Sequence, residues 1–186
     1  EKFTRWGQVF ALFIEDGKAT KNAYQRYLME RQCFFDQMEK HKNQIMQCRT
    51  ASDLDTAFRQ KKCAAILSVE NGAMLGGDIN RLLQLQQDGV KLLTLTWYGE
   101  NEIGFGSKMG GALKPFGREV VEALPHYGIL PDISHLSDEG VEEVFSLTRG
   151  PVVASHSNVR SIVPHFRNLK NDQIEELIRR NGLIGI

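Results

Sequence analysis

The sequence predicts an α/β fold built on a parallel sheet. From residue 63 onward, short apolar runs alternate with amphipathic helical segments, which is the order expected of strands joined by helical crossovers. The run VKLLTLT at 90–96 is almost continuously apolar, as in strands that are covered on both faces. Two topologies fit this pattern, an open doubly wound sheet and a (β/α)8 barrel.

Six strands are predicted, each an apolar run of strand length. They cover residues 9–14, 63–69, 90–96, 129–134, 152–155 and 183–186. The first, VFALFI, is expected to be buried like the others. A complete barrel takes eight strands and about 250 residues, so a barrel would be short by one βα unit at each end of this 186-residue chain. We therefore expect an internal portion of a longer protein.

The helices are predicted from their apolar spacing and from the residues at their ends. They cover residues 18–47, 52–61, 78–88, 115–124, 138–148, 158–166 and 172–180. Several helix starts carry a residue type that caps helices, namely Ser52, Asp78, Ser137 and, for the last helix, Asn171 or Asp172. The segment 97–114 is predicted to be a long Gly-rich loop.

Composition and charge argue against several classes of protein. Lys+Arg and Asp+Glu both number 23, so the formal net charge is zero, and no basic excess points to nucleic acid. The longest apolar runs are far below the roughly 20 residues that span a bilayer, so no transmembrane segment is expected. Cys33, Cys48 and Cys63 form no CxxC motif. They indicate neither a disulfide framework nor a thiolate zinc site, and they favour a cytoplasmic location.

Three side chains that can bind metals follow three of the predicted strands. Glu70, His135 and His156 each come directly after such a strand. In a parallel barrel these strand ends meet on one face, where barrel enzymes carry their chemistry. One carboxylate and two imidazoles form a ligand set for a divalent metal, with zinc the most natural occupant. Placement alone leaves two interpretations open, a metal site or ordinary structural and solvated residues.

Several local strings together resemble the membrane dipeptidase (renal dipeptidase) family of zinc peptidases. They are SVENG (68–72), LTLT (93–96), PFGREVV (115–121), DISHLSD (132–138), SHSNVR (155–160) and RNLKND (167–172). The similarity extends over nearly the whole chain, from GQVFALFI onward. It implies a (β/α)8 TIM-like barrel with about six of its eight strands in this chain. Residues 1–186 would then form a single metallo-hydrolase barrel domain that lacks the first and last βα units.

The resemblance also implies roles for individual residues. Glu70 corresponds to the catalytic carboxylate that bridges two zinc ions, and His135 and His156 correspond to the imidazoles that complete one zinc site. Arg167 matches the arginine that pairs with the C-terminal carboxylate of the substrate, a task that suits its planar fork. The implied reaction is hydrolysis of a dipeptide by a metal-bridging hydroxide. Asp132 is expected either to orient a ligand imidazole or to bond the backbone at a strand end.

Two features depart from the family pattern. The second zinc of the family takes ligands from an HxD motif on the first strand, and no HxD occurs in these 186 residues. Whether this chain binds metal by itself is therefore open. The family histidine that follows LTLT and polarises the substrate carbonyl aligns with Trp97. Tryptophan donates one N–H but accepts no metal. We interpret Trp97 as a substrate-contacting feature of a bacterial-type subfamily, which leaves the polarisation of the carbonyl without its usual residue. Asn101 and Tyr98 are the candidates to replace the histidine.

Three functions are compatible with the sequence. The leading prediction is a zinc-dependent metallo-dipeptidase that acts on small dipeptides, with a homodimer left open as its assembly. One alternative is another metal-dependent barrel enzyme of the amidohydrolase type. The other is a non-catalytic, barrel-derived protein that binds small ligands, because a fold does not by itself fix a function. An HxD motif missing from the complete protein would favour the last of these.

Overall fold

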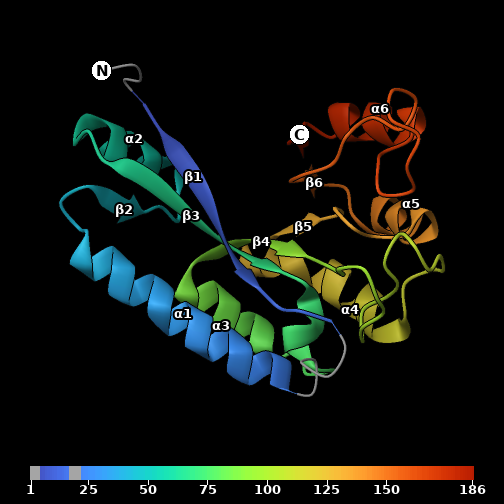
Figure 1. Ribbon diagram of the computed structural model, residues 1–186, viewed down its shortest axis with the longest axis horizontal. Coiled ribbons are helices and arrows are strands. Elements are labelled where there is room, and N and C mark those ends of the chain that lie inside the picture. Colours follow the sequence, from blue (N-terminus) through green and yellow to red (C-terminus); the bar gives the residue numbers. More distant parts are fainter. Residues whose placement is uncertain (1–4, 17–21) are drawn as a thin grey trace.

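Parallel strands form one curved sheet in the computed structural model, which describes residues 5–16 and 22–186 (Figure 1). Along the sheet the order is β1-β3-β4-β5-β6-β7, and β2 pairs separately with the beginning of β3. The strands are β1 (Gly7–Phe13), β2 (Ile45–Gln47), β3 (Cys63–Glu70), β4 (Val90–Thr94), β5 (Leu130–Asp132), β6 (Val153–Ala154) and β7 (Leu183–Ile184). A doubly wound sheet reverses its strand order at a switch point. Since this order runs in one direction, the architecture is a parallel half-barrel.

Helices connect successive strands, as the alternating pattern predicts. They are α1 (Ala23–Lys40), α2 (Ala51–Arg59), α3 (Arg81–Asp88), α4 (Pro115–Ala123), α5 (Asp138–Leu147) and α6 (Asn171–Arg179), with short 3-10 helices η2 (Gly72–Leu75) and η3 (Leu124–Tyr127). Helices α1, α2 and α3 lie toward one end of the sheet, and α5 and α6 lie toward the other (Figure 1). Among the described helices, none combines the length and the apolar character that crossing a bilayer requires.

Predicted caps are correct at some helices and wrong at others. Ser137 caps α5, since its Oγ accepts the backbone N–H of Gly140 at 3.2 Å. The N-cap of α2 is Thr50, two residues before the predicted Ser52, because Thr50 and Asp53 form a reciprocal capping box. Asp78 accepts the backbone N–H of Asn80 and stands before the start of α3. The residue before α6 is Lys170, so neither Asn171 nor Asp172 is its N-cap.

The segment predicted as a helix over 18–47 is divided. Residues 17–21 lie outside the described part of the chain, α1 ends at Lys40, and the chain then forms strand β2. Ile45 pairs with Cys63 at the beginning of β3. A backbone that can join an existing strand satisfies its N–H and C=O groups there, and this pairing outweighs the local helical preference of the residues.

The segment 158–166 is irregular rather than helical. A single turn forms, in which the N–H groups of Ile162 and Val163 both donate to the carbonyl of Val159. Pro164 follows directly, and proline lacks an N–H and pushes the preceding residue toward extended backbone. The prediction from spacing was wrong here because the proline ends the helix after one turn.

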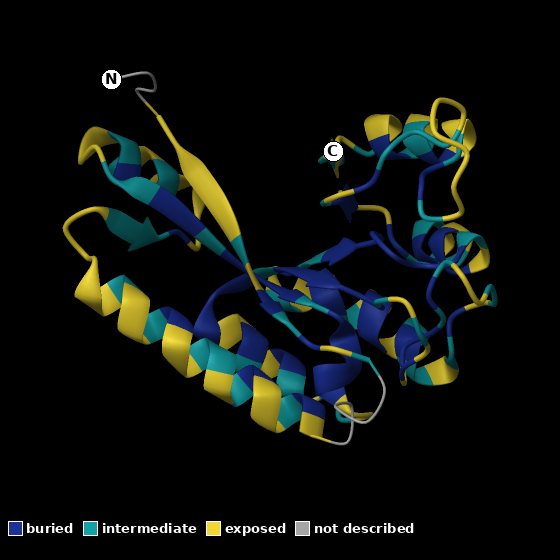
Figure 2. Ribbon diagram, viewed as in Figure 1, coloured by how far each residue is buried: buried dark blue, intermediate teal, exposed yellow. Residues whose placement is uncertain are grey.

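Strand β1 was predicted to be buried and is largely exposed. Its first half faces solvent (Figure 2), and Val9 is 39% exposed. In the described part of the chain β1 pairs with β3 alone, so it is an edge strand. The central strands β3, β4 and β5 carry most of the buried strand residues. An apolar sequence therefore identified β1 as a strand, whereas its exposure depends on its position in the sheet.

Candidate metal centre

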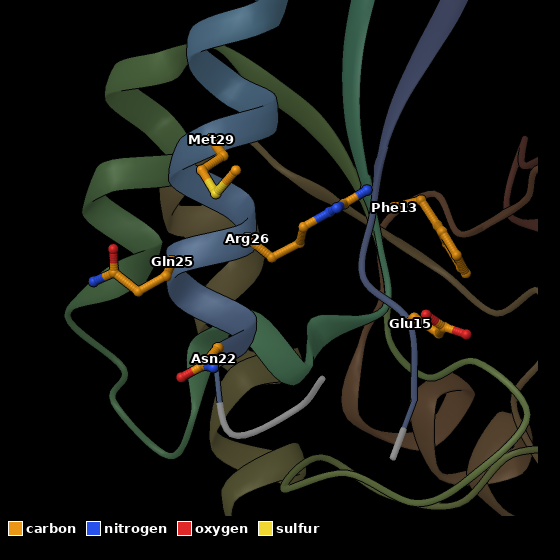
Figure 3. A pocket seen from close by; sticks show the side chains of 6 residues that line it. All are labelled: Phe13, Glu15, Asn22, Gln25, Arg26 and Met29. Atoms are coloured by element: carbon orange, nitrogen blue, oxygen red, sulfur yellow. The ribbon is translucent and has the colours of Figure 1, made fainter. Parts of the chain in front are cut away.

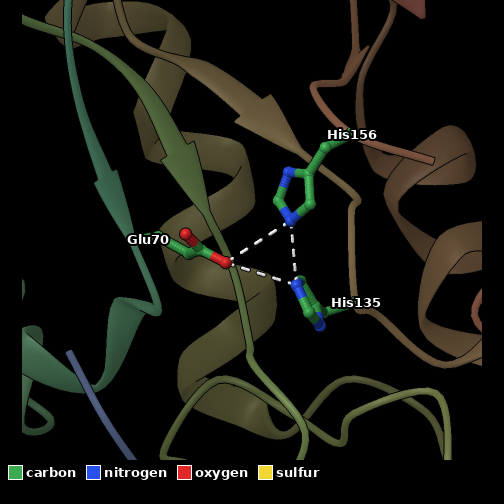
Figure 4. A group of neighbouring side chains, drawn as sticks. All are labelled: Glu70, His135 and His156. Carbon is green, nitrogen blue, oxygen red and sulfur yellow. Dashed lines mark hydrogen bonds and ion pairs between the residues drawn. The ribbon is translucent and has the colours of Figure 1, made fainter. Parts of the chain in front are cut away.

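The three predicted metal-binding side chains meet at one edge of the sheet. Glu70 is the last residue of β3, His135 follows β5, and His156 follows β6. All strand pairs are parallel, so the C-terminal ends of these strands lie on the same side. The Nε2 atoms of the two histidines are 2.9 Å apart, and they lie 3.2 Å and 3.4 Å from Oε1 of Glu70 (Figure 4). Residues far apart in the sequence thus form one compact group.

The chemistry and spacing of these atoms fit a divalent cation. A carboxylate oxygen and two imidazole nitrogens can each direct a lone pair toward a shared point. In a tetrahedral zinc site, bonds of about 2.0–2.2 Å separate neighbouring ligand atoms by roughly 3.3–3.6 Å. The observed triangle of 2.9, 3.2 and 3.4 Å is close to that size. Within the described residues, these three side chains are the one group of His, Cys, Asp or Glu residues whose ligand atoms lie close enough together to hold a metal.

Burial and charge favour the metal-binding protonation states of His135 and Glu70. The side chain of His135 is 6% exposed, that of Glu70 is 20% exposed and that of His156 is 45% exposed. Burial lowers the pKa of His135 below its ordinary value of 6.5 because it disfavours the imidazolium. The contact with His135, followed by that with His156, lowers the pKa of Glu70 from 4.5 to about 2. Both shifts favour the species that bind cations, neutral imidazole and carboxylate.

These shifts predict that acid destabilises the metal-free protein. A folded-state pKa below the unfolded value means that the unfolded chain binds more protons, so the free energy of unfolding falls as pH falls. The contribution of His135 is lost as pH drops through 6.5, and that of Glu70 is lost between 4.5 and about 2. Denaturant titrations in the presence of a chelator should therefore show that Glu70→Gln costs less stability as the pH is lowered from 4.5. A difference between wild type and Glu70→Gln that stays constant over this range would contradict the prediction, and Glu39→Gln, at an exposed position of α1, is the control.

The loop after β4 holds His135 in place. His135 has a φ of 72°, in the left-handed region that non-glycine residues adopt rarely. The backbone N–H of Ser107 donates to the His135 carbonyl at 2.6 Å. The Tyr98 ring contacts the imidazole edge-on, with centroids 5.2 Å apart. Nδ1 of His135 is buried and has no hydrogen-bond partner among the described residues. Packing and backbone geometry, rather than a hydrogen bond at Nδ1, therefore support this histidine behind its Nε2 contacts.

Asp132 performs both of the tasks that the sequence left open. Its Oδ1 accepts the backbone N–H groups of Ser134 and Ser155 at 3.0 and 2.9 Å. Its Oδ2 accepts the Ser155 hydroxyl at 2.5 Å, and the same hydroxyl lies 2.8 Å from Nδ1 of His156. Asp132 thus binds the backbone at the strand ends and reaches one imidazole through Ser155. That imidazole belongs to His156 and not to His135, although His135 is closer to Asp132 in the sequence.

Arg167 lies next to the same group. Its Nη2 donates to the carbonyl of His156 and its Nη1 donates to the hydroxyl of Ser157, both at 2.8 Å. Burial lowers the pKa of the guanidinium, and the negative charge of Asp132 opposes this shift. A guanidinium has five N–H donors, and these two bonds leave three for a ligand. The structure therefore places a fixed positive charge beside the candidate metal centre.

The aromatic residues after β4, Trp97 and Tyr98, lie next to the ring of His135. Trp97 is half-buried between Phe13 and His135, with ring centroids 4.9 Å and 6.2 Å away. Asn101 is buried, and its side chain bonds Asn71 and the backbone of the loop. Asn101 is therefore occupied as a structural residue, which argues against the prediction that it replaces the family histidine. Tyr98 is 45% exposed and touches His135, so of the two residues it is the one positioned to meet a ligand.

The structure also contains a pocket of about 550 Å³ (Figure 3). It lies between the end of β1 and helix α1 and is lined by Phe13, Glu15, Asn22, Gln25, Arg26 and Met29. Phe13 pairs with Glu70 in the sheet register and packs against Trp97. The pocket is therefore next to the candidate centre through Phe13, although none of the predicted site residues lines it.

Sequence reasoning missed the serine hydroxyls around the centre. Ser134, Ser155 and Ser157 stand beside the histidines in DISHLSD and SHSN. Their hydroxyls connect Asp132, His156 and Arg167 through hydrogen bonds. Hydroxyl residues adjacent to ligand-type residues at strand ends are the signal that could have identified them. The sequence does not show, however, which partner each hydroxyl selects.

The fold and the convergent ligands are typical of barrel proteins that hold a divalent metal at the C-terminal ends of their strands. This chain belongs to the family described as Membrane dipeptidase (Peptidase family M19), which matches residues 4–186. The resemblance inferred from the sequence strings is thereby confirmed. The family is one of metallopeptidases, so a metal cofactor is implied.

Known relatives agree with this assignment. Dipeptidase tcpJ of Claviceps purpurea (strain 20.1) is 29% identical over 154 residues, which are 80% of this chain and 36% of that protein. The crystal structure of the dipeptidase AC, a metallo peptidase of family M19, has a TM-score of 0.90 at 22% identity and covers 96% of this chain and 59% of its own. A metallo peptidase from Rhodobacter sphaeroides, liganded with a phosphinate mimic of the dipeptide L-Ala-D-Ala, has a TM-score of 0.88 at 22% identity, covering 96% and 60%. This chain spans 36% to 60% of the length of these relatives.

Proposed function

We propose that this chain carries one metal site of a zinc-dependent dipeptidase. The observation that carries the proposal is the meeting of Glu70, His135 and His156, whose ligand atoms lie within 3.4 Å of one another. Nitrogen and carboxylate ligands in a compact group suit zinc. Glu70 has a second carboxylate oxygen, which would be available to a second metal ion. Membership of the M19 family of metallopeptidases supports a metal cofactor at this site.

The chemistry of the proposed reaction is metal-assisted hydrolysis of a peptide bond. When bound, zinc would supply Lewis acidity and an activated water. Glu70, His135 and His156 would hold the metal, and burial favours the neutral imidazole of His135 by lowering its pKa. Arg167 fixes the substrate by pairing its planar fork with the free C-terminal carboxylate. Trp97 and Tyr98 form an apolar wall beside the scissile bond, and Phe13 supports that wall from the side of β1.

A dipeptide fits these residues better than a longer peptide does. Arg167 donates to the hydroxyl of Ser157 and to the carbonyl of His156. The side chain that would bind the substrate carboxylate is therefore attached to the short segment that carries the ligand His156. A carboxylate bound there must lie close to the bond that is cleaved. The phosphinate dipeptide mimic in the Rhodobacter sphaeroides structure supports a substrate of this size.

Chelation tests the proposal most directly. The complete protein, freed of metal with a chelator and dialysed, should lose hydrolysis of simple dipeptides and regain it when zinc is restored. The loss should be on the order of 10³-fold or more, because metal polarisation contributes several kcal/mol to the barrier. Undiminished activity of metal-free protein would refute the proposal. Turnover of cyclic amides but not dipeptides would indicate the amidohydrolase-type alternative, and ligand binding without any turnover would indicate a non-catalytic binding protein.

A further inference from the structure

A chain of hydrogen bonds runs from Asp132 through Ser155 to Nδ1 of His156, and each bond in it has a defined donor. It begins at Asp132, which is 1% exposed. Oδ1 accepts two backbone N–H groups, those of Ser134 and Ser155. Oδ2 faces two hydroxyls, Thr94 Oγ1 at 2.6 Å and Ser155 Oγ at 2.5 Å. A carboxylate has no proton to give, so both hydroxyls donate to it.

The direction of the next bond follows from counting protons on Ser155. Its hydroxyl carries one proton, and that proton points to Asp132. Ser134 Oγ is 3.5 Å from Ser155 Oγ, which is too long to compete with the 2.5 Å contact. Ser155 Oγ can therefore only accept at its 2.8 Å contact with Nδ1 of His156. The proton of that bond lies on Nδ1, so the other ring nitrogen, Nε2, keeps its lone pair.

This lone pair is the one that the candidate metal centre needs. Nε2 of His156 faces Oε1 of Glu70 at 3.4 Å and Nε2 of His135 at 2.9 Å. His156 is also the more exposed of the two histidines, with 45% of its side chain accessible. Its ring is therefore held less by packing than that of His135, whose Nδ1 has no hydrogen-bond partner in the described part of the chain. The hydrogen bond at Nδ1 therefore decides which nitrogen of this ring carries the proton.

We propose that Asp132 and Ser155 are positioning residues that hold His156 as its Nδ1–H tautomer, with Nε2 ready to bind a metal. The functional meaning of this arrangement rests on the proposed metal site. The tautomer itself does not, because it is a property of the metal-free protein and can be measured there.

Asp132→Asn should reverse the tautomer. The two backbone N–H groups at the Oδ1 position require an oxygen, so the new amide NH2 must face Thr94 and Ser155. Ser155 Oγ then accepts from the amide, and its own proton turns toward Nδ1 of His156. The ring is forced to carry its proton on Nε2, where it blocks metal binding. The same replacement next to a catalytic histidine produces the wrong tautomer in a serine protease.

The test is the imidazole ¹⁵N chemical-shift pattern of His156 in metal-free protein. Spectra at about pH 8.5, well above the ordinary imidazole pKa of about 6.5, should show Nδ1–H in the wild type and Nε2–H in Asp132→Asn. Thr94→Val is the matched control, because it removes a donor to the same Oδ2 atom without redirecting Ser155. It should keep Nδ1–H. Should Asp132→Asn fail to fold, Ser155→Ala should lose the uniform Nδ1–H pattern.

Zinc affinity gives a second measurement. Competition with a chromophoric chelator should show zinc binding weakened by about 10–100-fold in Asp132→Asn, the usual effect of changing a residue that orients a ligand. Thr94→Val should remain closer to wild type. A wild-type His156 with its proton on Nε2, or an unchanged tautomer in Asp132→Asn, would overturn the inference. A wild type that shows Nδ1–H and yet binds no zinc would contradict the proposed function and leave the inference intact.

Discussion

His135→Asn is expected to abolish dipeptide hydrolysis and to weaken metal binding more than Asp132→Asn does. The substitution removes one of three ligand atoms that lie within 3.4 Å of each other. Losing a direct ligand should cost more than the roughly 10–100-fold in metal affinity that follows loss of an orienting residue. Because metal polarisation contributes several kcal/mol to lowering the barrier, kcat/KM should fall on the order of 10³-fold or more.

Asparagine is the right replacement at this position. His135 has a φ of 72°, and asparagine tolerates the left-handed region better than alanine does. A loss of activity can then be attributed to the missing imidazole rather than to backbone strain. His41→Asn, at an exposed position after α1, is the matched control. Isothermal titration with zinc and a dipeptide hydrolysis assay check both effects. Wild-type zinc affinity in His135→Asn would contradict the assignment of this residue as a ligand.

Arg167→Lys should selectively impair substrates with a free C-terminal carboxylate. Lysine keeps the positive charge but loses the planar fork that pairs with both carboxylate oxygens. It also loses the two guanidinium nitrogens that donate separately to the hydroxyl of Ser157 and to the carbonyl of His156. A hydrogen bond to a charged group contributes about 1.5–3 kcal/mol, so kcat/KM for a dipeptide should fall roughly 10–100-fold.

Comparison with a neutral substrate isolates this effect. A dipeptide amide has no terminal carboxylate, so its slower turnover should be nearly the same in wild type and Arg167→Lys. The ratio of kcat/KM values for dipeptide and dipeptide amide is therefore the quantity to measure. Arg59→Lys, on the exposed end of α2, controls for a general effect of the replacement. Equal losses on both substrates would mean that Arg167 supports the structure of the site rather than binding the carboxylate.

The sequence predicted the strands and the ligand types well because both signals are local. Apolar runs predicted strands at 63–69 and 90–96, and the ends of the observed strands β3 and β4 lie within one or two residues of these bounds. Ligand-type residues directly after such runs indicated the edge of the sheet at which they meet. The long helix over 18–47 was wrong because β2 finds its partner in β3, which lies outside the segment. Spacing within a segment contains no information about such a partner.

The exposure of β1 and the hydrogen bonds of Asp132 depended on the same kind of distant partner. Val9 is exposed because β1 is an edge strand in the described sheet. Asp132 meets Thr94 because those two residues are register partners between β4 and β5, and it meets Ser155 just beyond β6. A shift of one residue in either strand pairing would turn these side chains to opposite faces.

The sequence by itself determined the fold class, the family and the chemical types of the metal-binding side chains. The fold class and the ligand types follow from apolar periodicity and from residue identities at strand ends, and the family follows from the resemblance of several short strings. All of these are properties of short segments. Only the tertiary structure decided the 2.9 Å approach of the two imidazoles, the left-handed backbone of His135 and the proton direction through Ser155. Each of these depends on strand register and loop packing between residues that are distant in the chain, and register is fixed only when the whole sheet assembles.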